Sequence, residues 1–181
     1  MPSFAVISSD GISSYHKDIF QIHVFVGFDH AHILEEAMKL TTFTDYSLRV
    51  LIYVASKPTG ELSTIDEIAQ VYRISRNHLT KSVHKLSKLG LIRTTRGRNG
   101  GFEICKDPKQ INIGWVVRQT EENWDVVECF DPKNFCILNP ACRLKGVLAR
   151  ALSAYLDVLD GVTLADITAN KRDLVGIFAT D

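Results

Sequence analysis

The sequence predicts a mainly helical fold with one small β-hairpin, in the order helix-turn-helix, hairpin and long helix. Two apolar patterns with helical spacing lie close together between residues 63 and 89, and a glycine-rich basic segment follows them directly. A third pattern, between residues 144 and 158, repeats at steps of four and three residues. These observations predict a winged helix-turn-helix domain at residues 38–107 and a dimerisation helix within residues 108–181.

The first 37 residues differ from the rest of the chain. A mixed apolar stretch at residues 19–28 is interrupted by polar residues and glycine, and its pattern does not continue into the domain. The first ten residues contain no Lys or Arg, so a signal peptide is not expected. We interpret residues 1–37 as an N-terminal extension and expect the true start of the protein at Met38.

The first helix of the domain is expected at about residues 44–56. Its apolar residues recur at helical spacing, and Pro58 and Gly60 end the pattern. Ser63 or Thr64 then begins a second helix, with Glu67 as the partner in a capping box.

Ser75 is the expected N-cap of a third helix, which Gly90 terminates. One apolar stripe runs along this helix: Leu79, Val83, Leu86 and Leu89. The opposite face is polar and mostly basic. Two helices joined by a short turn at about residues 65–88, with a basic outer face, indicate a helix-turn-helix unit whose second helix enters the major groove of DNA.

A hairpin is expected at residues 91–105. Two strand-like runs flank the segment RGRNGG at residues 96–101, where glycines permit a tight connection. We expect Arg96 and Arg98 to reach the DNA backbone or a narrow minor groove. Cys105 is expected to be a small buried residue of the returning strand. Together with the helix-turn-helix unit, this hairpin completes a winged helix.

Charge is distributed unevenly along the chain. Between Arg73 and Phe102 there are eight basic and no acidic residues, whereas the remainder holds 13 basic and 21 acidic residues. The net charge of zero therefore hides a surface suited to a polyanion. The residues expected to contact double-stranded operator DNA are Arg76, Asn77, His78, Lys81, Lys85, Arg96 and Arg98.

The composition, 45% hydrophobic and 23% charged, is typical of a soluble globular protein. No apolar run approaches the roughly 20 residues that span a bilayer, so no membrane association is expected. Four cysteines without a secretory signal indicate metal or redox chemistry in the cytoplasm rather than a disulfide scaffold. Neither a P-loop, a dinucleotide fingerprint nor a Ser-His-Asp arrangement is evident, and an enzyme is not expected.

A fourth helix is expected at residues 113–120. A long helix is expected to begin at Asn139–Pro140, where Asn is a suitable N-cap and Pro fits the first helical position. The apolar positions of the long helix form a seam of about two heptads: Leu144, Leu148, Ala151, Tyr155 and Val158. Such a seam suits either a partner helix or the helix's own domain. A homodimer is favoured because helix-turn-helix proteins usually bind two half-sites.

Three cysteines precede or begin the long helix: Cys129, Cys136 and Cys142, separated by six and five residues. Structural zinc sites usually contain closely spaced cysteine pairs, whereas wider spacing leaves room for an iron–sulfur cluster. From the residues alone, a cluster, a zinc ion, a thiol redox switch and three unrelated side chains all stay open.

Four segments taken together resemble one protein family: FTDYSLR at 43–49, SRNHLTK at 75–81, RGRNGG at 96–101 and NPACRLK at 139–145. They resemble the bacterial winged-helix iron–sulfur repressors, and most closely the nitric-oxide-sensing branch, over about residues 38–170. The cluster-biogenesis branch has a ligating His three residues after the last cysteine. This chain has Lys145 at that position.

The resemblance implies one [2Fe-2S] or [4Fe-4S] cluster per subunit, held by Cys129, Cys136 and Cys142. In the nitric-oxide-sensing branch, an Asp in the first helix of the other subunit is the fourth ligand, and Asp45 matches it. The implied function is a dimeric repressor that releases DNA when nitric oxide attacks the cluster. A sensor of iron or cluster supply is the competing hypothesis within the family. The basic helix and hairpin disfavour an electron carrier or thiol-redox enzyme.

Overall fold

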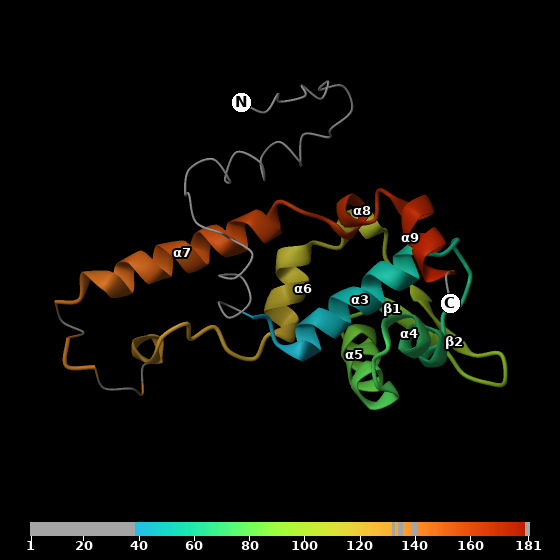
Figure 1. Cartoon of the computed structure of the whole chain (residues 1–181), viewed down its shortest axis with the longest axis horizontal. Helices are drawn as coiled ribbons and strands as arrows, with labels where there is room; N and C mark the ends of the chain where they lie inside the picture. Colours follow the sequence, from blue (N-terminus) through green and yellow to red (C-terminus); the bar gives the residue numbers. More distant parts are fainter. Residues whose placement is uncertain (1–38, 132, 134–135, 139–140, 180–181) are drawn as a thin grey trace, which may run out of the picture. The chain divides into compact units, whose positions relative to one another are not determined.

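The computed structural model describes residues 39–131, 133, 136–138 and 141–179 (Figure 1), and the predicted extension at residues 1–37 lies outside this part. Residues from Leu40 onward form one compact unit. Its elements are α3 (Thr42–Ser56), α4 (Ile65–Tyr72), α5 (Arg76–Lys88), β1 (Ile92–Thr95), β2 (Gly101–Ile104), η1 (Pro108–Gln110), α6 (Ile113–Thr120), η2 (Glu128–Phe130), α7 (Arg143–Asp160), α8 (Leu164–Ile167) and α9 (Lys171–Phe178). The mainly helical fold with a two-stranded wing is confirmed.

Local signals start the two helices of the helix-turn-helix unit. The Thr64 hydroxyl accepts a hydrogen bond from the Glu67 N–H, and the Glu67 carboxylate accepts one from the Thr64 N–H, which confirms the predicted capping box. Arg73 ends α4 in the left-handed conformation, with φ of 54°. Ser75 is the N-cap of α5, as expected, although its side chain makes no capping hydrogen bond.

The wing is a two-stranded antiparallel sheet in which Ile92 pairs with Ile104 and Thr95 with Gly101. Phe102 also exchanges two backbone hydrogen bonds with Ser63, both of 2.8 Å. A Cβ added to Gly101 would lie 2.5 Å from the Ser63 carbonyl oxygen, so only glycine permits this approach. The base of the wing is thus attached to the segment that leads into the helix-turn-helix unit.

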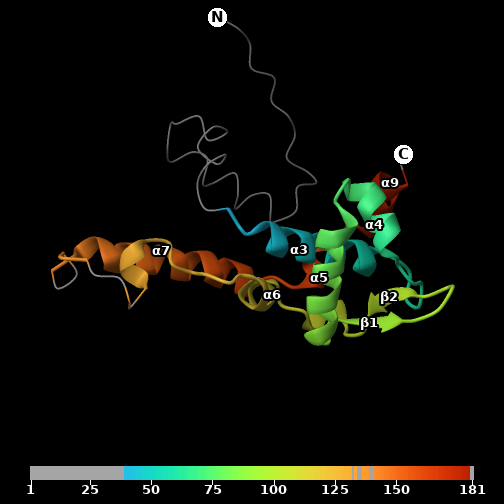
Figure 2. The same ribbon diagram turned by 90° about the horizontal axis from the view of Figure 1, so that it is seen from below.

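Helix α3 is the centre of the hydrophobic core and packs against α5, α6, α8, α9 and β2 (Figures 1 and 2). The core side chains come from nearly every element of this region and include Leu51, Ile68, Leu79, Leu86, Leu91, Phe102, Val116 and Leu164. We call residues 40–120 and 161–179 the body, because all buried side chains of the described part belong to them. The body therefore presents α5 and the wing on a rigid support.

We call residues 121–160 the arm, which comprises the cysteine loop (residues 121–142) and α7. None of its described residues is buried. Polar contacts hold both ends of the arm to the body. At its start, the Glu121 carboxylate accepts hydrogen bonds from the Thr41 N–H and hydroxyl, at 2.7 and 3.2 Å. At its end, the Arg118 guanidinium donates to both Asp160 carboxylate oxygens, at 2.5 and 2.6 Å. The Asn112 side-chain amide donates to the Asp160 carbonyl at 2.6 Å. No helix in the described part of the chain is long and apolar enough to cross a membrane.

Candidate nucleic-acid interface and cysteine loop

Helix α5 has one buried face and one solvent face. Leu79, Val83 and Leu86 are buried in the core, which fixes the rotation of the helix about its axis. The residues predicted to contact DNA lie on the other side: Arg76, Asn77, His78 and Lys81 are exposed, and Lys85 is half-buried. Because the apolar stripe is anchored, these polar side chains are presented together on one solvent-facing side of α5.

Two of these side chains already have partners within the body. Arg76 forms an ion pair with Asp66 of α4. The His78 ring lies 5.8 Å from the Tyr46 ring of α3, measured between ring centroids. The contribution of Tyr46 was missed from the sequence, because 32 residues separate it from His78 and no local pattern links them.

The tip of the wing carries two uncommitted arginines. Arg96 and Arg98 are exposed, and within the described part of the chain neither makes an ion pair with a carboxylate. Arg93, on the adjacent strand, donates instead to the Glu103 carboxylate at 2.8 Å across the sheet. The positive charge available to a phosphate backbone is therefore concentrated at the tip rather than at the base of the wing.

The three predicted cluster cysteines all belong to the cysteine loop. Cys129 lies in η2, Cys136 lies in the following segment and Cys142 is the N-cap of α7. All three are free, half-buried thiols. Nowhere in the described residues do three His, Cys, Asp or Glu side chains come close enough to hold a metal ion. The donor set suits a thiolate-bound iron–sulfur cluster chemically, but one copy of the chain does not gather it.

The expected start of the long helix was wrong. Helix α7 begins at Arg143, and Cys142 is its N-cap with an extended ψ of 110° rather than a residue of its first turn. The preceding Ala141 N–H donates to the Leu138 carbonyl at 3.0 Å, which closes a separate turn. Asn139 and Pro140 themselves lie outside the described residues. Cys142 still adjoins the N-terminal end of α7.

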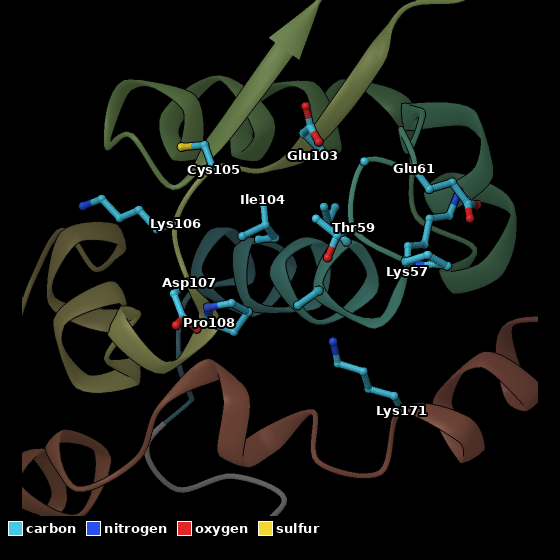
Figure 3. A pocket seen from close by; sticks show the side chains of 14 residues that line it. Lys57, Thr59, Glu61, Glu103, Ile104, Cys105, Lys106, Asp107, Pro108 and Lys171 are labelled. Carbon is cyan, nitrogen blue, oxygen red and sulfur yellow. The ribbon is translucent and has the colours of Figure 1, made fainter.

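Cys105 was expected to be buried, and this was also wrong. It follows β2 instead of belonging to it, and it is exposed. Its thiol donates to the Gly90 carbonyl at 2.8 Å, and its backbone N–H donates to the Leu91 carbonyl at 3.1 Å, at the base of the wing. Cys105 lines a pocket of about 410 Å³, into which the Lys171 side chain extends from α9 (Figure 3).

Asp45, the predicted fourth ligand, lies in the first turn of α3 and is partly exposed. Both of its carboxylate oxygens accept from Arg49 Nε, at 2.9 and 3.1 Å, and this contact raises the pKa of Arg49. The Arg49 guanidinium also lies 5.7 Å from the centre of the Tyr72 ring. Burial raises the pKa of Tyr72 to about 12, so its hydroxyl stays neutral at physiological pH.

Comparisons with known proteins agree with this architecture. The model of the Rrf2 family, described as an iron-dependent transcriptional regulator, matches residues 40–170. The chain is 58% identical over 138 residues to the HTH-type transcriptional regulator NsrR of Shouchella clausii, covering 76% of this chain and 93% of that protein. It is 55% identical over 139 residues to NsrR of Bacillus subtilis, covering 76% and 95%.

Among solved structures, the global cysteine regulator CymR of B. subtilis superimposes with a TM-score of 0.60 at 28% identity, covering 74% of this chain and 98% of that one. These relatives are transcriptional regulators, which excludes the enzymatic alternative. The helix-turn-helix unit, the basic wing and the match over most of the chain lead to one conclusion: this chain belongs to the Rrf2 family of transcriptional regulators.

Proposed function

We propose that this protein is a nitric-oxide-responsive transcriptional repressor that binds operator DNA as a cytoplasmic homodimer while its iron–sulfur cluster is intact. The observation that carries the proposal is the set of three free thiols on one loop, Cys129, Cys136 and Cys142. This loop connects the body to α7. The relatives to which the chain is 58% and 55% identical, over 138 and 139 residues, are named NsrR.

The cysteine loop is chemically suited to bind a cluster, although its thiols are not gathered at one point within the described residues. Its thiols are uncommitted, and Cys142 at the N-cap of α7 is placed where the helix dipole stabilises negative charge. The described side chains of a single chain form no metal site. Ligation therefore requires the loop to close around the cluster, so the presence of the cluster and the shape of the loop are coupled.

Asp45 of the partner subunit is the proposed fourth ligand. In the free chain both of its oxygens are occupied by Arg49, so ligation must break an exposed i,i+4 ion pair. Such pairs contribute only about 0.3–0.5 kcal/mol, which makes the exchange inexpensive. We expect Arg49 to retain its contact with the Tyr72 ring after its ion pair with Asp45 is broken.

When bound, the cluster supplies iron that nitric oxide can attack. The chain's own residues provide the response. A cysteine loop whose thiols no longer hold an intact cluster is released from Asp45 of the partner. Because the body carries α5 and the wing, loss of this tie changes the spacing between the two DNA-reading heads. A dimer with altered head spacing no longer matches both half-sites of its operator.

The test is DNA binding by anaerobically purified protein, with and without nitric oxide, together with absorbance and Mössbauer spectra of the cluster. Cys129→Ala, Cys136→Ala and Cys142→Ala should each purify without a stable cluster and lose operator affinity. Asp45→Ala should have an intermediate effect, because water or a thiol can replace one oxygen ligand. Cys105→Ala is the matched control and should behave like the parent, since Cys105 lies at the wing and not in the cysteine loop.

A sensor of iron or cluster supply is the second candidate, favoured by the description of the family as iron-dependent. The two candidates differ in one measurement. A cluster-loaded protein whose operator affinity is unchanged by nitric oxide but falls on iron limitation would establish the supply sensor and exclude the nitric oxide sensor.

A further inference from the structure

We propose that Asp66 is a specificity-determining residue for DNA binding, because it positions Arg76 of α5 to read a guanine base and disfavours contact of this arginine with phosphate. The inference rests on the proposed function at one point, that α5 is the helix that enters the major groove. It goes beyond that function by assigning a role to a carboxylate that is not itself one of the predicted DNA contacts.

Arg76 and Asp66 lie where the two helices of the helix-turn-helix unit begin. Arg76 is the first residue of α5, and Asp66 is the second residue of α4. Arg76 Nη1 donates to Asp66 Oδ1, and the two side chains are 67% and 63% exposed. In helix-turn-helix proteins, the N-terminal residues of the second helix contact base edges. The pair therefore lies at the end of α5 where bases are expected to be read.

This ion pair is not what holds α4 against α5. Ile68 of α4 is fully buried in the core, and Ile74 between the two helices is also buried. The Ile74 N–H donates to the Ala69 carbonyl at 3.2 Å, which closes the turn. An ion pair between exposed side chains adds little stability to such a packed arrangement. The core thus fixes the position of Asp66 relative to Arg76, and the pair itself is available for a role in binding.

Asp66 is an exception in the charge pattern around α5. No acidic residue occurs between Arg73 and Phe102. Among the basic residues of α5, Arg76 alone forms an ion pair with a carboxylate of the described part of the chain. A carboxylate at the edge of a DNA-binding surface repels phosphate and so weakens binding to every DNA sequence. Such a charge increases specificity when it disfavours incorrect contacts more than the correct one.

The chemistry of arginine explains how one carboxylate can have this effect. A guanidinium carries five N–H donors in a planar fork. Asp66 accepts from Nη1, a contact that leaves the edge formed by Nε and Nη2 outside the ion pair. This edge matches the O6 and N7 acceptors of guanine, which arginine binds with two hydrogen bonds. The adjacent carboxylate also offsets part of the positive charge and lowers the attraction to phosphate. Arg76 is therefore directed toward a base.

Base preference is the direct test of Arg76. Operator duplexes are selected from a random library with the full, cluster-loaded chain under anaerobic conditions, and affinity is measured for each single-base variant of one half-site. We expect the parent to prefer guanine at one position by about tenfold. Arg76→Ala and Arg76→Lys should both lose this preference, because lysine keeps the charge but cannot make the bidentate contact. Parental preference in both variants would overturn the assignment.

The role of Asp66 is tested on the same duplexes and on a scrambled duplex. Asp66→Ala should reduce the guanine preference to about threefold and raise affinity for the scrambled duplex by about threefold, because the released arginine then binds phosphate. On the scrambled duplex, the slope of log affinity against log salt should become steeper by about one unit. Asp66→Glu should restore the parental preference, since it again offers a carboxylate.

Glu61→Gln is the matched control for Asp66→Ala. It removes a carboxylate that is also exposed and ion-paired but lies outside the helix-turn-helix unit. This variant should keep the parental base preference and salt slope. Equal effects of Glu61→Gln and Asp66→Ala, or a parental preference in Asp66→Ala, would overturn the proposal.

A double variant separates positioning from the effect of charge alone. In the Arg76→Ala background, Asp66→Ala should no longer change the base preference or the salt slope, because the residue through which it acts is absent. Equal effects in both backgrounds would mean that the carboxylate acts only through its charge. A purely structural role would instead lower the urea midpoint of unfolding and leave the base preference unchanged. Either result would overturn the positioning role.

This inference and the proposed function fail separately. A protein whose guanine preference depends on Arg76 and Asp66 but whose operator affinity is unchanged by nitric oxide retains the inference and loses the sensing function. A protein that releases its operator in nitric oxide, while Asp66→Ala keeps the parental preference, retains the sensing function and loses the inference.

Discussion

The body and the arm of this protein differ in how their apolar residues are covered. The body buries most of its apolar residues in one core around α3 and fully covers Leu79 and Leu86 of α5, although Trp115, Val175 and Ile177 are exposed. The arm buries none of its described residues, although α7 carries Leu144, Val147 and Val158 at 61%, 47% and 67% exposure. A single copy of the chain is thus sufficient to form the DNA-reading surface and insufficient to cover the arm.

This difference assigns different tasks to the two regions. Preorganisation of α5 and the wing lets the body bind DNA without a folding cost at each encounter. In the proposed function the arm, by contrast, depends on a partner subunit and a bound cluster for its final structure, so its state can change while the body stays intact. Such a division is what a switch requires, and the following predictions test it from the largest expected effect to the smallest.

The largest effect is expected for Leu79→Ala in the body. Leu79 is fully buried beneath the DNA-facing side of α5, and its truncation leaves a cavity in a packed core. We expect the free energy of unfolding to fall by about 2–5 kcal/mol in urea denaturation. Leu144→Ala in the arm is the matched control, and at protein concentrations where the chain is monomeric it should change this free energy by less than about 0.5 kcal/mol. Equal losses for both variants would remove the distinction between body and arm.

The second prediction concerns the seam of α7. Replacing Leu144 and Val158 with Ser removes two apolar side chains that one chain leaves exposed. We expect the dimer dissociation constant, measured by analytical ultracentrifugation, to rise by roughly 100-fold. Circular dichroism of the monomer should show unchanged helix content and the same unfolding transition. A dimer that persists with parental affinity would mean that α7 does not form the interface.

Gly114→Ala is expected to act where the arm joins the body. A Cβ at this position would lie 2.1 Å from Asp160 Oδ1 and 2.8 Å from the Asp160 backbone N, so α7 must shift away from α6. We expect a loss of about 1–3 kcal/mol in the free energy of unfolding. Gly146→Ala, on α7 with nothing near its added Cβ, is the control and should be neutral or slightly stabilising. Equal stability of the two variants would show that the α6–α7 junction is adaptable.

Arg96→Ala should have a smaller effect that is confined to DNA binding. The side chain is exposed at the wing tip, so its loss should leave stability unchanged and weaken operator binding. The slope of log affinity against log salt should become less steep by about one unit for a lost phosphate contact. Arg93→Ala is the control, because Arg93 is paired with Glu103, and it should change the slope less. The same slope for Arg96→Ala and the parent would exclude Arg96 from the interface.

The smallest effect is expected from the Asp160 carboxyl at low pH. Hydrogen bonds from Arg118 hold the pKa of Asp160 below its ordinary value. A depressed pKa contributes stability above the unfolded-state pKa of about 3.9, and the contribution is lost as pH falls through the folded-state pKa. The stability difference between the parent and Asp160→Asn should therefore be constant near pH 6 and shrink below about pH 4. A difference that grows on acidification would contradict this pairing.

Much of the body was predictable from short stretches of sequence. The capping box of Thr64 and Glu67, the apolar stripe from Leu79 to Leu86, helix α6 and the wing were all predicted at or near their observed places. Each of these signals acts within one or two turns of the chain, through a hydrogen bond to a nearby backbone group or a repeat of apolar side chains. Local patterns of this kind are visible in a single sequence.

The failures occurred where a backbone contact outweighs the preference of the residue itself. The residues Asn139–Pro140 are favourable for a helix start, but a turn closed between Leu138 and Ala141 moves the start of α7 to Arg143. Cys105 resembles a core residue by type, yet the strand pairing ends one residue earlier and leaves it exposed. In both cases the local preference was real and a neighbouring backbone contact outweighed it.

By itself, then, the sequence determined the helices from α3 to α7, where the wing turns, and which thiols and basic side chains are available for chemistry, but it did not predict α8 and α9. Only the tertiary structure decided which groups of different elements meet: Tyr46 with His78, Arg118 with Asp160 beside Gly114, and Arg49 with the Tyr72 ring. The physical reason is that helix caps and apolar repeats depend on residues a few positions apart. Contacts between elements depend instead on how the whole core packs. Tyr46 and His78 are 32 positions apart and Arg118 and Asp160 are 42 positions apart, and no periodic sequence pattern links residues at such separations.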